Sequence, residues 1–310
     1  MGVSSSPDGR RTFPLVSRRR LVGVPFGEVA SRRRGRGSEV IGHRRYERGD
    51  PVATIDWPAS ARLSATSGTD AFVVRDRAAD EAPCVVLVID RRPAMGLYPE
   101  PLPWLAKRTA LREAAAAIAI SATVARADIA ALDYGDGAPW WLPPGSRDRP
   151  WLIVEREGSA PFAAPDDTLE RGLAFLHRRR LQIPSGSFIF VLSDFLSPPS
   201  SEALGIAVGQ GWDVVPVVIG DPVWEQSFPA VGGIALPVSD PGGGQIKLVR
   251  LSRRQAQARR EANIRRHQSL RRQFAAFGLR PIEVGSSDPW GIDTSFIEWA
   301  SERSGIRRAR

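Results

Sequence analysis

Residues 84–90 read CVVLVID, a run of six apolar residues that ends on an aspartate. Such runs are typical of strands buried on both faces, because a strand with one solvated face alternates apolar and polar residues. Two similar runs follow, SFIFVLSDF at 187–195 and WDVVPVVIG at 212–220. These three runs predict the centre of a parallel β-sheet.

Helical segments separate these strands and shorter apolar runs flank them. We expect helices over 103–127, 167–180 and 200–209, and further strands over 72–76 and 128–134. After them the sequence predicts a hairpin with a glycine turn (232–252), an arginine-rich helix (252–277) and a last strand (278–284). Alternating strands and helices predict an α/β fold whose open, mostly parallel sheet has helices on both faces. The GGG at 242–244 lacks the residues of a phosphate-binding loop and is interpreted as a hairpin turn.

Composition divides the chain into three parts. Residues 1–30 contain Ser, Gly and Arg clusters and predict a flexible tail, 31–80 predict an irregular or β-rich N-terminal extension, and 81–305 predict the α/β domain. The longest apolar helix, near 114–125, is charge-free for about a dozen residues, whereas about 20 are needed to cross a bilayer. The apolar stretch at 13–16 is shorter than the core of a secretion signal. We therefore expect a cytoplasmic protein without a membrane span.

The charge balance is basic, with 43 Lys and Arg against 34 Asp and Glu in 310 residues. Lys107 and Lys247 are the only lysines. A net charge of +9 favours acidic partners, but it bears on association rather than on fold. The one cysteine, Cys84, opens a buried strand, so we expect an inert thiol and no disulfide within the chain.

Aspartates end three of the predicted strands. Asp90, Asp133 and Asp194 follow apolar runs, and the carboxyl ends of parallel strands are where open α/β sheets bind ligands. Carboxylates gathered there could bind Mg²⁺ through oxygen. The alternative is that each aspartate caps the turn or helix that follows it, as aspartates commonly do. The cap is the favoured interpretation for any single residue.

The placement of Asp90 and Asp194 resembles the metal-ion-dependent adhesion site of von Willebrand factor type A domains. That site has an Asp-x-Ser-x-Ser motif after the first strand, and here Arg92 and Ala94 stand at the two serine positions. The family's middle threonine aligns with Asp167. The resemblance implies a degenerate site of Asp90, Asp167 and Asp194. Because arginines repel a divalent cation, we expect no cofactor there, or at most weakly held Mg²⁺.

A second resemblance covers residues 34–63, RGRGSEVIGHRRYERGDPVATIDWPASARL. The stretch is similar to the signature of a bacterial family named domain of unknown function 58, whose type A-like domains associate with MoxR-type AAA+ ATPases. The matching residues are Gly35, Gly37, Glu39, Arg45, Tyr46, Gly49, Asp50, Asp56, Trp57, Ser60, Ala61 and Arg62. The likeness continues through the aspartate-ended strands to RQFAAFGLRPIEVGSSDPWGIDTSFIEWASERSG, and so covers about 30–305.

The physical role of this signature has two interpretations. Its arginines and carboxylates, such as Arg62, Asp50 and Asp56, could pair to fix an irregular segment, and Asp56 before Pro58 suits a helix start. Trp57 supplies an apolar anchor. The signature is then either a structural clasp or a partner-binding surface.

The arginine-rich helix carries four Arg doublets spaced six residues apart, at 253, 259, 265 and 271. At 100° per residue, each doublet is turned by about 240° from the one before, so the doublets form no single basic stripe. Leu270, Phe274 and Phe277 share a face and predict that the C-terminal half of the helix packs on the domain.

These features predict a non-enzymatic protein-interaction module. No serine, cysteine or histidine stands in a recognisable nucleophile–base motif. The family resemblance implies an adaptor or chaperone-like partner of a MoxR-type AAA+ ATPase. Two alternatives stay open: a basic nucleic-acid-binding protein, which the arrangement of the arginines does not favour, and a metal-dependent adhesion-type protein binder.

Overall fold

The structure is a computed structural model that describes residues 11–16, 40–46, 55–68, 72–77, 84–97, 105–145, 150–238 and 247–308. The chain forms two compact units, one of residues 1–19 and 83–310 and the other of residues 20–82. Each unit is described by itself. Among the described residues, no helix combines the length and the apolar character needed to cross a membrane.

The larger unit is built on a six-stranded mixed sheet. The strands lie in the order β10 (Ile282–Val284), β7 (Asp213–Ile219), β6 (Phe188–Ser193), β3 (Cys84–Ile89), β4 (Asp128–Asp133) and β5 (Trp140–Leu142). Neighbouring strands are parallel except β4 and β5, which are antiparallel. The apolar run at 84–90 is therefore the central strand β3, and the predicted α/β fold with an open, mostly parallel sheet is confirmed.

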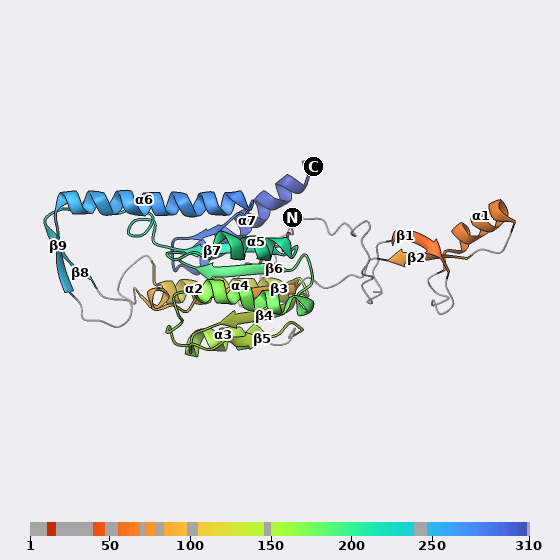
Figure 1. Ribbon diagram of the computed structural model, residues 1–310, viewed down its shortest axis with the longest axis horizontal. Coiled ribbons are helices and arrows are strands. Elements are labelled where there is room, and N and C mark those ends of the chain that lie inside the picture. Colours follow the sequence, from red (N-terminus) through yellow and green to blue (C-terminus); the bar gives the residue numbers. More distant parts are fainter. Residues whose placement is uncertain are drawn as a thin grey trace. The chain divides into compact units, whose positions relative to one another are not determined.

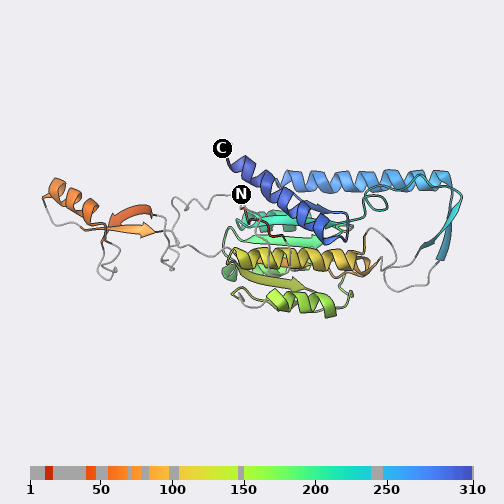
Figure 2. The same ribbon diagram turned by 180° about the vertical axis from the view of Figure 1, so that it is seen from behind.

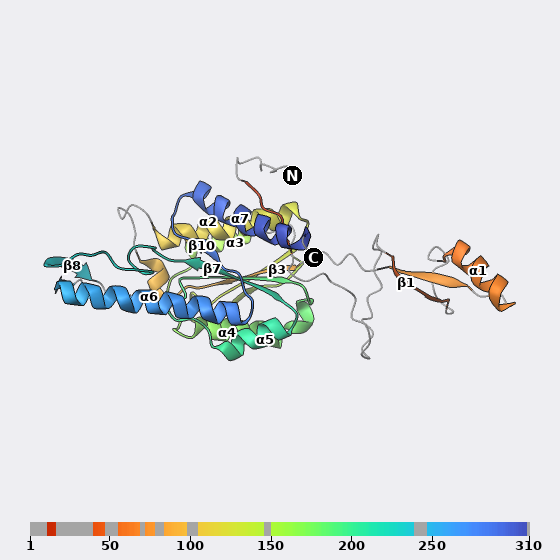
Figure 3. The same cartoon turned by 90° about the horizontal axis from the view of Figure 1, so that it is seen from above.

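Helices cover both faces of this sheet, as Figure 3 shows. One face carries α2 (Lys107–Val124), α3 (Pro150–Ser159) and α7 (Pro289–Arg308), and the other carries α4 (Thr168–Arg178), α5 (Ser201–Gly209) and part of α6 (Arg253–Ala276). Two short 3₁₀ helices, η2 (Pro93–Gly96) and η3 (Arg180–Gln182), complete this part. Burial on both sides explains why the strand sequences do not alternate in polarity.

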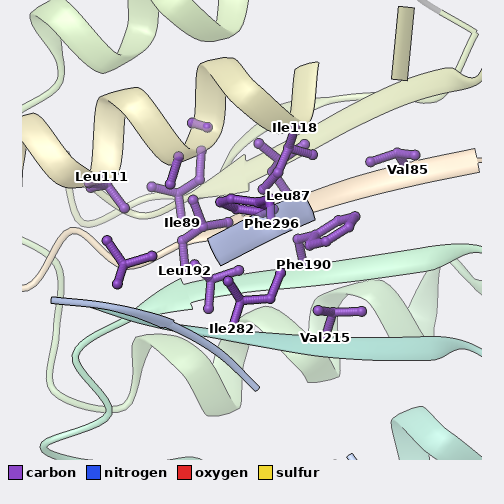
Figure 4. Packing of buried hydrophobic residues seen from close by; sticks show 14 of the residues in the cluster. Val85, Leu87, Ile89, Leu111, Ile118, Phe190, Leu192, Val215, Ile282 and Phe296 are labelled. Carbon is purple, nitrogen blue, oxygen red and sulfur yellow. The ribbon is translucent and has the colours of Figure 1, made fainter. Parts of the chain in front are cut away.

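Strand β3 supplies side chains to both cores. Val85, Leu87 and Ile89 pack with Leu111 and Ile118 of α2 (Figure 4), whereas the alternate residues of the strand join the core beneath α4 and α5. Because successive strand residues face opposite sides of a sheet, one strand ties both helical layers to it. Cys84 is buried at the start of β3, and burial, aided by the charge of Asp128, raises the pKa of its thiol to about 12. The expected burial of Cys84 at the start of the core strand is thus confirmed, and the raised pKa favours an inert thiol.

Part of the predicted tail belongs to the core. In the segment 11–16, Phe13 is buried and stacks on Phe296 of α7, with ring centroids 4.8 Å apart. The Phe13 backbone N–H donates to Ser121 Oγ of α2 (3.2 Å). The prediction of a flexible tail is wrong for these residues, because the Phe13 ring packs into the apolar core between α2 and α7.

A projecting arm follows the sheet strands in sequence. Strands β8 (Ile234–Val238) and β9 (Lys247–Leu251) form an antiparallel hairpin that leads into α6. Figure 1 shows this hairpin and the N-terminal half of α6 extending beyond the edge at which the parallel strands end. We call β8, β9 and residues 253–262 the arm. The hairpin prediction is confirmed, while its GGG turn lies outside the described residues.

The C-terminal half of α6 is fixed to the domain at several points. Asn263 Nδ2 donates to the carbonyl oxygen atoms of Trp224 (3.0 Å) and Ser227 (2.5 Å), and Leu270 and Phe274 are buried in the core. The Phe274 ring meets Phe195 edge-on at 5.2 Å. The predicted packing of this half of the helix is therefore confirmed.

The smaller unit contains a two-stranded antiparallel sheet of β1 (Val40–Arg45) and β2 (Val73–Arg77), together with α1 (Trp57–Ser67). The predicted strand at 72–76 is β2. Asp56 begins α1 as the sequence predicts, since its Oδ1 accepts from the N–H of Ala59 (3.1 Å). The β-rich extension thus has a helix as well as strands.

Candidate functional site

The three strand-end aspartates share one local geometry. The Oδ1 atom of each accepts from the backbone N–H two residues later: Asp90 from Arg92 (2.9 Å), Asp133 from Gly135 (2.9 Å) and Asp194 from Leu196 (3.0 Å). Each carboxylate thereby fixes the turn by which the chain leaves the sheet. The capping interpretation is confirmed for all three, and each also has a cationic partner.

Asp90 is held by the guanidinium group of Arg92. Arg92 Nε lies 3.0 Å from both carboxylate oxygens of Asp90, and Nη2 lies 2.5 Å from Oδ2. Ser193 Oγ, at the end of β6, donates to the same Oδ2 (2.7 Å). Arg92 also donates through Nη1 to the carbonyl of Ser197 (3.1 Å). The arginine at the family's first serine position therefore binds the carboxylate directly.

Asp194 lies between two cations. Arg92 Nη2 is 3.5 Å from its Oδ1, and Nζ of Lys107, from the first turn of α2, is 2.9 Å from its Oδ2. Lys107 Nζ also contacts Oε1 of Glu225 (2.5 Å), a residue of the loop after β7. The other oxygen of Glu225 accepts from the Asp221 backbone N–H (3.0 Å). We call Asp90, Arg92, Lys107, Asp194 and Glu225 the charge cluster.

The charge cluster keeps its cations protonated although it is buried. Burial is the largest influence on the Lys107 ammonium and lowers its pKa, but the carboxylates of Asp194 and Glu225 outweigh it, and the pKa is raised. For Arg92, burial is likewise outweighed by Asp90 and Asp194, and its pKa is also raised. Buried carboxylates are tolerated only when they are paired and hydrogen-bonded, and these contacts meet both conditions.

A second ionic group surrounds Asp133. Arg156 of α3 donates to both of its oxygens (2.8 and 2.7 Å) and to Asp136 (2.8 Å). Arg91, fully buried, donates to Glu157 Oε1 (2.6 Å). Burial, helped by the charge of Asp133 and opposed by Arg91 and Arg156, raises the pKa of the Glu157 carboxyl to about 7. The ion pair of Arg156 with Asp133 holds α3 beside β4, and it occupies both oxygens of the Asp133 carboxylate.

The residues at this edge do not fit a divalent cation. The guanidinium of Arg92 contacts both Asp90 and Asp194, so a cation joining these two carboxylates would meet a positive charge. Asp167, expected at the threonine position, is exposed and pairs with Arg171 (2.7 Å) one turn further along α4. The structure thus brings Asp90 and Asp194 together and places Asp167 in a separate ion pair. Within the described ranges, no group of three His, Cys, Asp or Glu residues is arranged to hold a metal ion.

The signature residues lie in the smaller unit. Ser60 Oγ accepts from the Val73 N–H (2.9 Å) and donates to the Asp56 carbonyl (2.7 Å), and so joins α1 to β2. The Trp57 ring is 57% exposed although it meets Phe72 edge-on at 6.0 Å. The Tyr46 ring also meets Phe72 edge-on, with ring centroids 6.4 Å apart. Asp56 and Ser60 are therefore structural, while Trp57 leaves much of its apolar surface uncovered.

Other signature residues have fewer described contacts. Arg45, Ala61 and Arg62 are all exposed. The Nε atom of Arg62 donates to the Pro58 carbonyl oxygen (3.2 Å). The remaining predicted signature positions, Gly35, Gly37, Glu39, Gly49 and Asp50, lie outside the described residues. The choice between a clasp and a partner surface therefore stays a prediction.

Sequence reasoning missed Lys107, Ser193 and Glu225. Lys107 carried a signal, because it is one of two lysines in a chain that otherwise uses arginine. Ser193 immediately precedes Asp194 at a strand end, but a serine there has many structural roles. Glu225 follows the last long strand by six residues and had no pattern to single it out.

Comparison with known proteins identifies a family and similar solved structures. Residues 42–270 match the family described as "Protein of unknown function DUF58". A crystal structure described as an aerotolerance-related membrane protein from Bacteroides fragilis NCTC 9343, with multiple mutations to serines, is similar at 12% identity and a TM-score of 0.44. The match covers 71% of this chain and 100% of that chain, a likeness too low to support a functional inference. No curated protein matches the sequence.

Proposed function

The chain belongs to the DUF58 family, and from that premise we propose that it is a non-catalytic protein-interaction module. In this proposal it acts as an adaptor or chaperone-like partner of a MoxR-type AAA+ ATPase in the cytoplasm. The ATPase supplies nucleotide hydrolysis and this chain supplies recognition. The arm carries the proposal, because it offers a large charged surface beside the carboxyl edge of the sheet.

The exposed charge of the arm favours an acidic partner. Between residues 247 and 262 there are six basic side chains and one acidic side chain, Glu261, and all seven residues are exposed. The basic residues are Lys247, Arg250, Arg253, Arg254, Arg259 and Arg260. Complementary charges speed association and suppress incorrect partners. A protein surface with clustered carboxylates would complement the positive charge of this arm.

The apolar residues of the arm favour protein over nucleic acid. Leu248 and Val249 of β9 are 75% and 38% exposed, and stretch 247–262 contains no aromatic residue for stacking on bases. The arginine doublets of α6 also point in different directions, whereas nucleic-acid binding usually needs one basic face. Aliphatic side chains surrounded by arginines suit a protein interface with an apolar centre and a charged rim.

Binding to the purified MoxR-type ATPase of the same organism tests the proposal. We expect the full chain to bind, and the triple variant Arg254→Glu/Arg259→Glu/Arg260→Glu to bind at least tenfold more weakly in calorimetry. The control Arg178→Glu/Arg180→Glu/Arg272→Glu makes the same charge change at exposed positions outside the arm and should have a much smaller effect. Absence of binding by the unaltered chain would remove the ATPase from the proposal.

The same variants separate a protein partner from nucleic acid. Titration with a DNA duplex and with RNA at several salt concentrations would show a steep loss of affinity with salt if phosphates were the target. We expect no binding tighter than non-specific association at physiological salt. Tight binding that the arm variant abolishes would favour the nucleic-acid alternative.

The proposal includes no catalytic step and no cofactor. Its support is that each strand-end aspartate fixes a turn and has an internal cationic partner, which leaves these carboxylates committed to structure. The metal-dependent adhesion-type alternative requires a cation at Asp90 and Asp194, where Arg92 already lies.

A further inference from the structure

We infer that Arg92 and Lys107 are built-in replacements for the divalent cation of an adhesion-type site, so that side chains and not a metal ion hold this edge of the sheet together. The inference concerns this chain's own side chains and does not depend on the proposed function. It rests on three observations: the position of Arg92, the bridge made by Lys107, and the burial of both.

The position of Arg92 is the first observation. Its sequence position corresponds to a serine that would be a metal ligand in the motif, but its guanidinium bends back to contact Asp90 and reaches Asp194 across the edge. Ser193 Oγ, which lies 3.1 Å from Nη2, completes the polar contacts on this side. The residue that removes a ligand thus also supplies a positive charge between the two remaining carboxylates.

The bridge made by Lys107 is the second observation. Its ammonium joins Asp194 to Glu225, so a chain of alternating charges runs from β3 through β6 to the loop after β7. Two monovalent cations have the same total charge as one divalent cation. Spread over two side chains, that charge holds together loops that follow three different strands.

Burial is the third observation. Arg92 is 5% exposed and Lys107 is 0% exposed, so the positive charges that face Asp90 and Asp194 lie inside the domain. The replacement is therefore internal, and neither cation is open to a carboxylate of another molecule.

Metal titration of the full chain is the first test. Calorimetry and thermal unfolding with Mg²⁺ and with Mn²⁺ should show no binding at millimolar concentrations and no rise in Tm. Binding of one Mn²⁺ that is lost in both Asp90→Asn and Asp194→Asn would overturn the inference, because the metal would then occupy the place assigned to the side chains.

Removal of the built-in cations is the second test. The variant Arg92→Ser/Lys107→Met should lose thermal stability in the absence of metal, regain part of it with Mn²⁺ and bind the ion. The matched control Arg108→Ser/Arg112→Met removes two positive charges with the same replacement residues, at exposed positions in the first two turns of α2. It should show no response to Mn²⁺. A folded double variant that gains no response would contradict the inference.

Single variants keep the test decisive if the double variant does not fold. Arg92→Lys keeps a positive charge at the site and should remain insensitive to Mn²⁺, whereas Arg92→Ser should gain a Tm rise with Mn²⁺. Equal Mn²⁺ responses of these two variants would show that the charge at position 92 does not exclude metal, and the inference would fail.

Discussion

The ring of Phe13 fills an aromatic pocket between α2 and α7. It stacks on Phe296, and the Trp299 ring meets it edge-on at 6.0 Å. We expect Phe13→Ala to lower the free energy of unfolding by about 3–5 kcal/mol, the usual cost of removing a buried aromatic ring. Urea unfolding followed by tryptophan fluorescence measures this loss. Phe72→Ala, at an exposed ring of the smaller unit, is the comparison and should cost far less at the larger unit's transition.

Glu157 predicts a pH dependence of stability. Its folded-state pKa is about 7, above the ordinary glutamate value, so the folded protein holds this proton more tightly than the unfolded chain. The resulting stabilisation is complete below about pH 4.5 and is lost as pH rises through about 7, with a total on the order of 3 kcal/mol.

Unfolding at pH 5 and pH 8 tests the role of Glu157. Glu157→Gln keeps a hydrogen-bond acceptor for Arg91 but does not titrate, so the fall in stability between these pH values should be smaller in the variant than in the unaltered chain. Equal falls would show that Glu157 titrates normally in the folded protein.

The charged residues show what sequence alone can predict at this scale. Asp90 and Asp194 were found because parallel strands end at one edge, which brings residues about a hundred positions apart together. The contact of Lys107 with Glu225 could not be found, since the distance between α2 and the loop after β7 depends on helix packing. Asp167, which the sequence aligns with the threonine of the adhesion-type site, lies at the start of α4, and its exposed pairing with Arg171 separates it from the cluster.

At the scale of elements, α6 depends on its first residues. Ser252 forms a capping box with Gln255: the serine Oγ accepts from the Gln255 N–H (3.3 Å), and Gln255 Oε1 accepts from the Ser252 N–H (2.9 Å). We expect Ser252→Ala to weaken the first turns of α6 by about 1 kcal/mol.

Hydrogen exchange read residue by residue checks this effect. In Ser252→Ala, amides near 254–258 should exchange faster, while amides near 270–276, which lie in the packed half of the helix, should be unchanged. Ser269→Ala, at an exposed position inside the helix, is the control. Unchanged exchange at the start of α6 in Ser252→Ala would mean that the hairpin, and not the cap, holds it.

Elements with strong patterns were predictable and weakly patterned ones were not. Strands β3, β6 and β7 are apolar on both faces, so each appears in the sequence as an uninterrupted apolar run. Helix α2 is predictable from its long alanine-rich stretch. Strand β5 has only three residues, Trp140–Leu142, and pairs antiparallel with β4, which a repeated strand–helix pattern does not indicate. The helices α3 and α7 mix tryptophans, glycines and charges, so their periodicity is weak.

At the scale of the whole molecule, Arg303 joins distant parts of the larger unit. From α7 it forms two contacts with Asp213 at the start of β7 (2.7 and 3.1 Å) and donates to the Val16 carbonyl (3.0 Å), 287 residues away. We expect Arg303→Met to cost about 3–5 kcal/mol, because it leaves a buried aspartate without its guanidinium partner.

A double-mutant cycle in urea isolates the Arg303 pair. Arg303→Met/Asp213→Asn should cost less than the sum of the two single changes, because removing both charges avoids a buried carboxylate without this cation. Arg272→Met, at an exposed position of α6, should change stability by less than about 0.5 kcal/mol. Strict additivity in the cycle would show that the two charges are not coupled.

The burial of Phe13 also bears on how the protein is made. Its partners Phe296 and Trp299 follow it by more than 280 residues, so the ribosome must synthesise that stretch before this part of the core can form. Until then the apolar surface of α2 that Phe13 and α7 will cover is exposed to other nascent chains. The contact therefore forms long after Phe13 itself is synthesised, and this interval is a period in which aggregation competes with folding.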